Sequence, residues 1–235
     1  MKLSILIPAF NEERTIGQIL DIVAHVDLPV GVERELIVVD DCSGDNTATI
    51  VKTFAAQHPN VTLLQHPENR GKGAALHTGI AAATGEYVMI QDADLEYDPR
   101  EYKDLLKPVL EREADVVYGS RFQGGNPHRI LFFWHSLGNK MLTQMCNAVS
   151  NLNLTDMETC YKLIRTDLLQ SLRLREKRFG FEPEVTIRLS RVPGIKIYEV
   201  GISYHGRTYA EGKKIGWRDG FRALYVIAKT GLSRG

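Results

Sequence analysis

The sequence contains little cysteine, no net charge and no long hydrophobic run. Its 235 residues include three widely spaced cysteines, Cys42, Cys146 and Cys160. Such an odd and sparse set predicts neither a disulfide framework nor a zinc site. The 29 basic and 29 acidic residues give a formal net charge of zero, whereas nucleic-acid binders usually carry a basic excess. We therefore expect the three cysteines to be reduced thiols. We also expect the protein to have no nucleic-acid partner.

The sequence pattern also lacks a signal peptide and a membrane-spanning helix. The apolar run within Met1–Pro8 is too short for a signal peptide. No run approaches the roughly 18 consecutive apolar residues of a transmembrane helix. The pattern predicts a cytoplasmic protein, and it leaves open whether the protein rests on the cytoplasmic face of a membrane.

Two common nucleotide-binding motifs are absent. No Gly-x-Gly-x-x-Gly follows the first apolar run, which argues against a dinucleotide-dependent dehydrogenase. The glycine-rich segment Asn69–Gly73 does not have the spacing of a phosphate-binding P-loop. If the protein binds a nucleotide, residues outside these two motifs must contact it.

Short apolar runs alternate with amphipathic ones along the first half of the chain. Runs rich in valine, isoleucine and leucine on both faces are typical of parallel strands covered by helices. We expect strands at Leu3–Pro8, Glu35–Asp40, Val61–Gln65, Tyr87–Ile90 and Asp115–Gly119. We expect helices at Glu12–His25, Asp45–Gln57, Gly73–Ala83 and Pro99–Glu111. This alternation predicts right-handed βαβ units and a doubly wound α/β sheet.

The second half is less regular. Helices are expected at Ile130–Leu152, Phe181–Arg191 and Trp217–Lys229, and strands at Tyr161–Ile164 and Ile195–Val200. No internal repeat or linker interrupts the chain. With 43% hydrophobic and 25% charged residues, the composition is ordinary for a globular domain of this length. We expect a single domain over residues 1–235.

Polar clusters follow the predicted strands. They are Asn11-Glu12, Asp40-Asp41, Asn69-Arg70 and the Asp92/Asp94 pair. Ligands of doubly wound sheets bind beyond the carboxyl ends of the strands. This coincidence predicts one shared binding site.

The segment Asp92-Ala93-Asp94 directly follows the predicted strand Tyr87–Ile90. Two carboxylates one residue apart can turn toward one divalent cation, and such ligands suit Mg²⁺ or Mn²⁺, which often bridge carboxylates and phosphates. The cation would neutralise the charge that grows on a nucleoside-diphosphate leaving group. The alternative is a solvated acidic turn.

Three further segments predict contacts to a nucleotide. Asp41 could accept a hydrogen bond from the N–H of uracil or of guanine, while Asp45 caps the next helix. The turn Pro8–Glu12 could hold ribose or base. Lys72 opens a helix, where it could meet a phosphate or a sugar.

Taken together and in this order, the motifs resemble family-2 glycosyltransferases, and especially the dolichyl- or polyprenyl-phosphate sugar transferases of the dolichol-phosphate mannose synthase group. The resemblance covers nearly the whole chain. It rests on Pro8-Ala9-x-Asn11-Glu12, Asp40-Asp41, Asn69-x-Gly71-Lys72-Gly73, Asp92-Ala93-Asp94-Leu95, Gly119-Ser120-Arg121 and Asp156–Lys162.

The resemblance implies an α/β fold of the GT-A type, a Rossmann-like mixed sheet flanked by helices that binds a nucleotide sugar. Residues 1–120 would form the nucleotide-sugar half and residues 121–235 the acceptor half. The implied metal ligands, for Mg²⁺ or Mn²⁺, are Asp92, Asp94 and Glu96. The implied nucleotide-sugar contacts are Pro8, Ala9, Asn11, Glu12, Asp41, Lys72, Asp92, Arg207 and Lys213.

The resemblance also implies an acceptor site. Arg121, Arg129 and Ser136 would bind the acceptor phosphate, and Glu182 would contact the sugar. The implied catalytic residues are Asp156, Arg121 and Arg207. Other members use a carboxylate at the position of Asp156 as a base, but a phosphate acceptor is already ionised near neutral pH, so Asp156 could orient the acceptor instead.

The expected reaction is the inverting transfer of a hexose from GDP-mannose or a UDP-hexose to a polyprenyl phosphate. Two alternatives stay open, namely a glycosyltransferase acting on a hydroxyl acceptor and a non-catalytic nucleotide-sugar sensor. The predicted helices Ile130–Leu152 and Trp217–Lys229 carry aromatic and basic residues that suit peripheral contact with a bilayer. Packing in the protein core would equally explain the apolar residues of these two helices.

Overall fold

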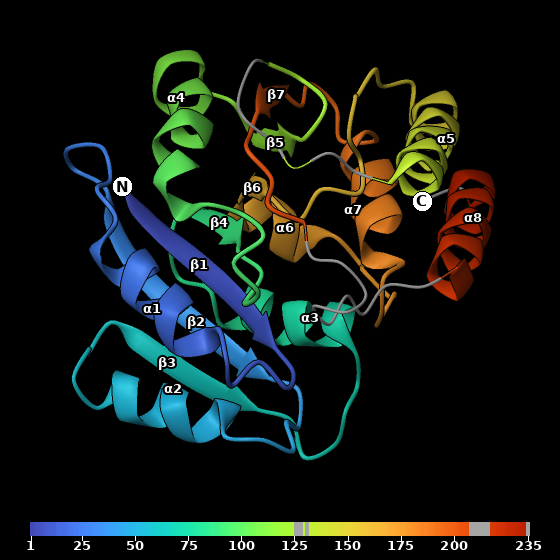
Figure 1. Ribbon diagram of the computed structural model, residues 1–235. Helices are drawn as coiled ribbons and strands as arrows, with labels where there is room; N and C mark the ends of the chain where they lie inside the picture. Colours follow the sequence, from blue (N-terminus) through green and yellow to red (C-terminus); the bar gives the residue numbers. More distant parts are fainter. Residues whose placement is uncertain (125–128, 130–131, 207–216, 234–235) are drawn as a thin grey trace.

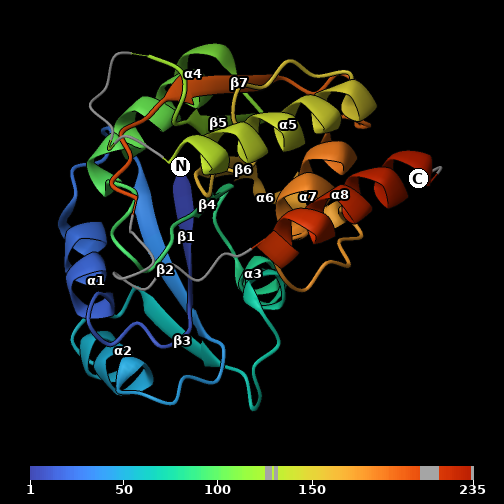
Figure 2. The same ribbon diagram turned by 45° about the vertical axis from the view of Figure 1, so that its right-hand side comes forward.

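The computed structural model describes residues 1–124, 129, 132–206 and 217–233. Its centre is a seven-stranded sheet in the order β3-β2-β1-β4-β6-β5-β7. The strands are β1 (Lys2–Ala9), β2 (Glu33–Asp40), β3 (Val61–Gln65), β4 (Tyr87–Ile90), β5 (Val116–Ser120), β6 (Lys162–Arg165) and β7 (Ile197–Gly201). Figure 1 shows α1 and α2 on one side of the sheet, and Figure 2 shows α3 on the other.

The helices of the structure are mostly those that the sequence predicts. They are α1 (Ile16–His25), α2 (Thr47–Ala55), α3 (Lys72–Ala82), α4 (Tyr102–Arg112), α5 (Phe133–Ser150), α6 (Thr166–Ser171), α7 (Phe181–Leu189) and α8 (Trp217–Leu232). A short 3₁₀ turn, η1 (Pro99–Glu101), precedes α4. Among the described residues, no helix is both long and apolar enough to cross a membrane.

The strands at the centre of the sheet are buried on both faces. The neighbouring side chains Ile5 and Leu6 of β1, which point to opposite faces, are 0% and 1% exposed, and Leu36 and Ile37 of β2 are 0% and 3% exposed. Such strands lie between two layers of helices, which explains why their apolar runs are continuous and do not alternate. The predicted strands and the predicted α/β class are therefore confirmed.

The sheet is mixed because one strand runs against its neighbours. β6 pairs antiparallel with both β4 and β5, whereas β1, β2, β3 and β4 are parallel to one another and β5 is parallel to β7. Regular βαβ alternation alone predicted a parallel arrangement, which is wrong for β6. The mixed sheet that the family resemblance implied is confirmed.

Several element boundaries differ from the predicted ones. The helix expected from Glu12 begins at Ile16, because Glu12–Thr15 forms a turn in which the carbonyl of Glu12 accepts from the N–H groups of Thr15 and Ile16. The short helix α6 was not predicted, since six residues show no clear period. Asp45 accepts hydrogen bonds from the N–H and the hydroxyl of Thr47, at 3.0 and 2.5 Å. The N-cap residue of α2 is Asn46, one position after the predicted Asp45, whose side chain nevertheless accepts from the first N–H group of the helix.

The start of α3 is pressed against the loop that precedes α7. Ala74 donates its N–H to the carbonyl of Lys177 at 2.9 Å. A Cβ atom built on Gly73 would lie 2.4 Å from the carbonyl oxygen of Glu176 and 2.9 Å from that of Arg178. Only glycine permits this approach, which fixes the first residue of α3, Lys72, beside the carboxyl ends of the central strands.

We predict that Gly73→Ala destabilises the protein by about 1–3 kcal/mol, because its methyl group must displace backbone rather than a flexible side chain. The matched control is Gly138→Ala within α5, where an added Cβ meets nothing within 4 Å. Alanine there should stabilise the helix by about 0.4–1 kcal/mol. Urea unfolding of both variants measures the difference, and equal effects would contradict the tight docking of α3.

Candidate active site

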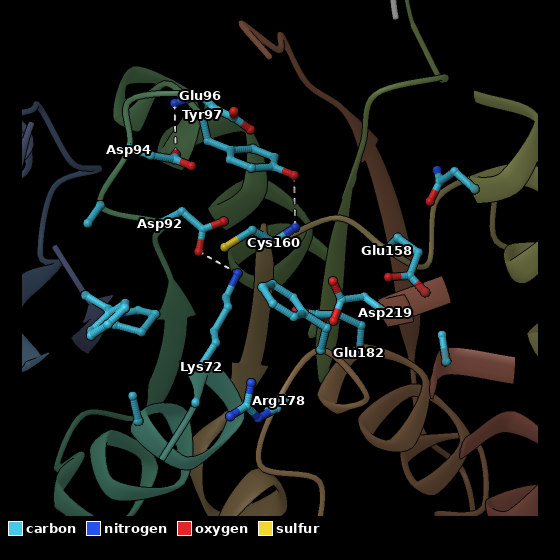
Figure 3. Close-up of a pocket in the computed structure, with 18 of the residues that line it drawn as sticks. Lys72, Asp92, Asp94, Glu96, Tyr97, Glu158, Cys160, Arg178, Glu182 and Asp219 are labelled. Carbon is cyan, nitrogen blue, oxygen red and sulfur yellow. Dashed lines mark hydrogen bonds and ion pairs between the residues drawn. The ribbon is translucent and has the colours of Figure 1, made fainter. Parts of the chain in front are cut away.

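A cavity of about 980 Å³ lies beyond the carboxyl ends of β1, β2 and β4 (Figure 3). The residues with a predicted role that line it are Pro8, Ala9, Glu12, Asp41, Lys72, Asp92, Asp94, Glu96, Arg121 and Glu182. These residues come from segments far apart in the sequence. The structure therefore brings most of the predicted set to one place.

The reversed strand β6 explains why the second half of the chain reaches the same cavity. Because β6 runs antiparallel to β4 and β5, the segment Asp156–Tyr161 that leads into it lies at the edge where those two strands end. The thiol of Cys160 donates a long contact to the carbonyl of Ile90, the last residue of β4, at 3.8 Å. The residues that follow β4 and the residues that precede β6 therefore line the same wall of the cavity.

Lys72 and Asp92 form an ion pair inside the cavity. The Nζ of Lys72 lies 2.6 Å from Oδ1 of Asp92, and Figure 3 shows the lysine reaching up from α3. Burial alone would lower the pKa of Lys72, but the charge of Asp92 raises it well above its usual value. Burial would raise the pKa of Asp92, and Lys72 lowers it. Both groups are therefore held in their charged forms.

Asp94 and Glu96 lie in the turn after Asp92. Oδ1 of Asp94 accepts from the N–H of Glu96 at 3.2 Å, and Leu95 between them has a positive φ of 61°. Glu96 is 9% exposed and accepts a hydrogen bond from the hydroxyl of Tyr204 at 2.6 Å. Figure 3 shows Asp92 and Asp94 on the same wall of the cavity.

The carboxylates of Asp92 and Asp94 fit one side of a divalent-metal site. In the described part of the chain, no group of three or more histidine, cysteine, aspartate or glutamate side chains could hold a metal ion. Magnesium-type ions commonly bind one or two carboxylates and complete their shell with water and substrate phosphates. The donor set thus suits a cation held jointly by the protein and a phosphate ligand. The roles of these residues as metal ligands stay predictions.

Asp41 organises the loop that leads into α3. Its carboxylate accepts from the N–H of Arg70 at 2.9 Å and from that of Gly71 at 2.7 Å. It also contacts Nδ1 of His66 at 2.6 Å. Asp41 lines the cavity, but these contacts already occupy much of its hydrogen-bonding capacity. Its contact with a nucleobase stays a prediction.

Arg121, which lines the cavity, forms a second ion pair with the fully buried Asp156. Nε and Nη2 of Arg121 donate to Oδ2 and Oδ1 of Asp156, at 2.6 and 2.7 Å. Asn139 of α5 donates to Oδ1 at 3.0 Å. Burial would raise the pKa of Asp156, but the Arg121 charge and these hydrogen bonds lower it below its usual value. Asp156 is therefore an ionised carboxylate that orients Arg121. Its catalytic role stays a prediction.

A third buried pair joins β6 to α7. Lys162, which is fully buried, donates to Glu182 and to the carbonyl of Thr159. Glu182 lines the cavity from the start of α7. Its contact with the sugar stays a prediction.

The other predicted residues do not line the cavity in the described part of the chain. Asn11 holds the Cys42–Asp45 turn, because its Oδ1 accepts from the N–H of Gly44 at 2.8 Å. Arg129 donates to the carbonyl of Gly206 at 3.0 Å, and Ser136 lies in the first turn of α5. Arg207 and Lys213 lie outside the described residues.

Several cavity residues were not predicted. They are Asn139, Glu158, Cys160, Arg178, Tyr204 and Asp219. Glu158 and Cys160 belong to the motif Asp156–Lys162, so the sequence could have indicated that they lie near the site. The others lie on α5, near α7, after β7 and on α8, where no motif signals that a side chain turns toward the site.

Residues 4–173 match glycosyl transferase family 2. The chain belongs to this family. An undecaprenyl-phosphate mannosyltransferase of Micrococcus luteus is 31% identical to this family-2 chain, over 99% of the chain and 95% of the relative.

Two longer relatives are also similar to this family-2 chain. A dodecaprenyl-phosphate galacturonate synthase of Rhizobium johnstonii is 24% identical over 91% of the chain. A dolichyl-phosphate beta-glucosyltransferase of Trichomonas vaginalis is 28% identical over 86% of the chain. The aligned regions span only 62% and 65% of these two relatives.

Solved structures show the fold of the family-2 chain. Glucosyl-3-phosphoglycerate synthase of Mycobacterium tuberculosis, in complex with Mn²⁺, UDP and phosphoglyceric acid, superposes with a TM-score of 0.73. The match covers 100% of this chain and 80% of that one, at 20% identity. The predicted GT-A fold is therefore confirmed.

We predict that Asp156→Asn destabilises the protein by about 3–5 kcal/mol, because it leaves the buried charge of Arg121 without its counter-ion. The matched control is Asp167→Asn, which breaks an exposed pair with Arg165 and should cost at most about 1 kcal/mol. Urea unfolding measures both.

The contribution of Asp156 to stability also depends on pH. Since the folded pKa of Asp156 is lowered, its stabilisation is present above about pH 4, the unfolded value, and is lost as the pH falls through the folded pKa. Equal costs for the two variants would contradict this role.

Proposed function

We propose that this family-2 enzyme transfers a hexose, with inversion, from a nucleotide sugar to a polyprenyl phosphate. The observation that carries the proposal is that one cavity holds two cations at different places, Lys72 beside Asp92 and Arg121 on Asp156. A transfer between a sugar diphosphate and a lipid phosphate needs two such anion sites. The similarity to relatives named as dolichyl- or polyprenyl-phosphate sugar transferases supports it.

The donor diphosphate would lie at the Lys72 and Asp92 end. A divalent cation, Mg²⁺ or Mn²⁺, held by Asp92 and Asp94 with Glu96 nearby, would supply Lewis-acid stabilisation of the leaving group. Lys72 would turn from Asp92 to a phosphate oxygen. Pro8, Ala9, Glu12 and Asp41 would line the nucleotide, and Arg207 and Lys213 would complete the contacts to the diphosphate.

The acceptor phosphate would lie on the guanidinium of Arg121. The planar fork of arginine suits two phosphate oxygens, and Asp156 holds its orientation. An oxygen of this phosphate attacks the anomeric carbon, a new carbon–oxygen bond forms, and the bond to the nucleoside diphosphate breaks. Because the attacking phosphate is ionised near neutral pH, the displacement needs no proton transfer from the protein.

The first test is a panel of GDP- and UDP-hexoses with short polyprenyl phosphates and Mn²⁺, reading released nucleotide and glycolipid. Asp94→Ala should lower turnover about 100-fold or more, as expected when charge stabilisation of a leaving group is lost. Removal of metal by a chelator should have the same effect. Asp104→Asn, on the exposed side of α4, is the control and should turn over normally.

Two outcomes would contradict parts of this proposal. Normal turnover by Asp94→Ala, or in the presence of chelator, would exclude the metal assignment. Transfer to hydroxyl acceptors such as phosphoglycerate, with inert polyprenyl phosphate, would favour a family-2 enzyme with a hydroxyl acceptor.

Peripheral membrane contact is part of the same proposal. The exposed apolar side chains on α5 and α8 include Phe133, Trp134 and Phe221, which are 69%, 77% and 66% exposed. The two helices pack side by side (Figure 2), and Trp134 also lines the cavity. Aromatic side chains beside basic ones suit a bilayer surface, and Arg222 and Lys229 flank Tyr225 on α8.

We predict that a double variant, Phe133→Ser with Phe221→Ser, binds vesicles of anionic phospholipid at least about tenfold more weakly, because two aromatic anchors are lost. Val30→Ser is the matched control, since Val30 is fully exposed in the loop before β2. Co-sedimentation with vesicles measures binding. Equal binding by both variants would exclude this face as the contact.

A further inference from the structure

Glu158 carries a polar atom that the fold leaves unsatisfied. Its Oε1 is buried and has no hydrogen-bond partner among the described residues, while the side chain lines the cavity. Buried carboxylate oxygens are almost always hydrogen-bonded, and each exception needs an explanation. A ligand in the cavity is such an explanation.

Glu158 lies on the segment Asp156–Cys160, whose two ends reach the two anion sites. Asp156, two residues earlier, holds Arg121. Cys160, two residues later, contacts the end of β4 next to Asp92. Figure 3 shows Glu158 across the cavity from Asp92 and Asp94. A sugar whose diphosphate lies at Asp92, and whose anomeric carbon faces an acceptor on Arg121, would pass close to Glu158.

The cations around Glu158 are engaged by other carboxylates. Lys162 is paired with Glu182, and Arg121 is paired with Asp156. Asp219 of α8 lines the same cavity. Burial first, and then the negative charge of Glu182, raise the pKa of Glu158 to about 7. This wall therefore offers hydrogen-bond acceptors, and above neutral pH Glu158 carries a negative charge that Lys162 and Arg121 offset only in part.

We propose that Glu158 recognises the transferred sugar and restricts it to an uncharged hexose. Its Oε1 accepts a hydrogen bond from a sugar hydroxyl, and its charge repels a sugar that carries a carboxylate. The proposal rests on the proposed function and goes beyond it by naming the class of sugar. It also separates this chain from the Rhizobium relative, which is named as a galacturonate synthase.

The charge of Glu158 acts on a hexuronate at short range. Two like charges a few ångströms apart in a partly buried site disfavour binding by roughly tenfold or more. A neutral hexose meets no such repulsion and satisfies the buried oxygen. Replacing the carboxylate with an amide of the same size removes the charge while retaining a hydrogen-bonding group, so Glu158→Gln separates the two effects.

The test measures dissociation constants by calorimetry at pH 8 with Mn²⁺, for UDP, UDP-glucose and UDP-glucuronate, and for GDP, GDP-mannose and GDP-mannuronate. We expect the wild-type protein to prefer the hexose to the uronate by about tenfold or more with whichever nucleotide it binds. Glu158→Gln should reduce this preference to about threefold or less, and the affinity for the nucleoside diphosphate alone should change by less than about twofold. Glu111→Gln, exposed on α4, is the matched control and should behave as wild type.

A second variant keeps the inference testable if Glu158→Gln unfolds. Glu158→Asp retains the charge but shortens the side chain by one methylene group, so its carboxylate lies farther from the sugar. This variant should still reject the uronate while binding the hexose more weakly. An unchanged preference in Glu158→Gln, or a wild-type protein that binds hexose and uronate equally, would overturn the inference. Wild-type protein that binds neither nucleoside diphosphates nor nucleotide sugars would instead overturn the proposed function.

Discussion

The candidate site depends on one constraint, the antiparallel insertion of β6 between β4 and β5. Its hydrogen bonds to both neighbours fix where the preceding segment must lie. If β6 ran parallel, Asp156–Tyr161 would approach from the opposite edge of the sheet. Reversal places Cys160 at the end of β4 and brings Asp156 to Arg121, with Glu158 between them on the same segment. The acceptor-side and donor-side residues therefore meet because of strand direction.

Charge pairing then fixes the side chains in this site. Lys72 with Asp92, Arg121 with Asp156, and Lys162 with Glu182 form three pairs in or beside the cavity. Removing two charges from water is costly unless each has a close partner, so every cation is held in one orientation. The same pairing prepares Lys72 and Arg121 to receive anions, since a phosphate can replace or share the carboxylate partner. Oε1 of Glu158 is the exception, since it is buried without a hydrogen-bond partner among the described residues.

Much of the first half was predictable from the sequence, because its elements are local patterns. The continuous apolar runs at Leu3–Pro8 and Tyr87–Ile90 are typical of strands buried on both faces, and the polar residues that follow such strands are expected at one edge of a parallel sheet. Asp41, Lys72, Asp92 and Asp94 were found in this way. The second half was less predictable. The direction of β6 depends on long-range pairing, and α6 is too short to show a helical period.

The sequence by itself determined the family, the central strands and the order of the motifs, because these depend on residue type and spacing along the chain. It also placed two carboxylates after β4, where a cation and a diphosphate could meet. Only the tertiary structure decided that Asp156 holds Arg121, that Asp41 holds the loop before α3, and that Oε1 of Glu158 has no hydrogen-bond partner among the described residues. Each of these depends on which distant atoms lie within hydrogen-bonding distance in a packed interior, and spacing along the chain does not encode such distances.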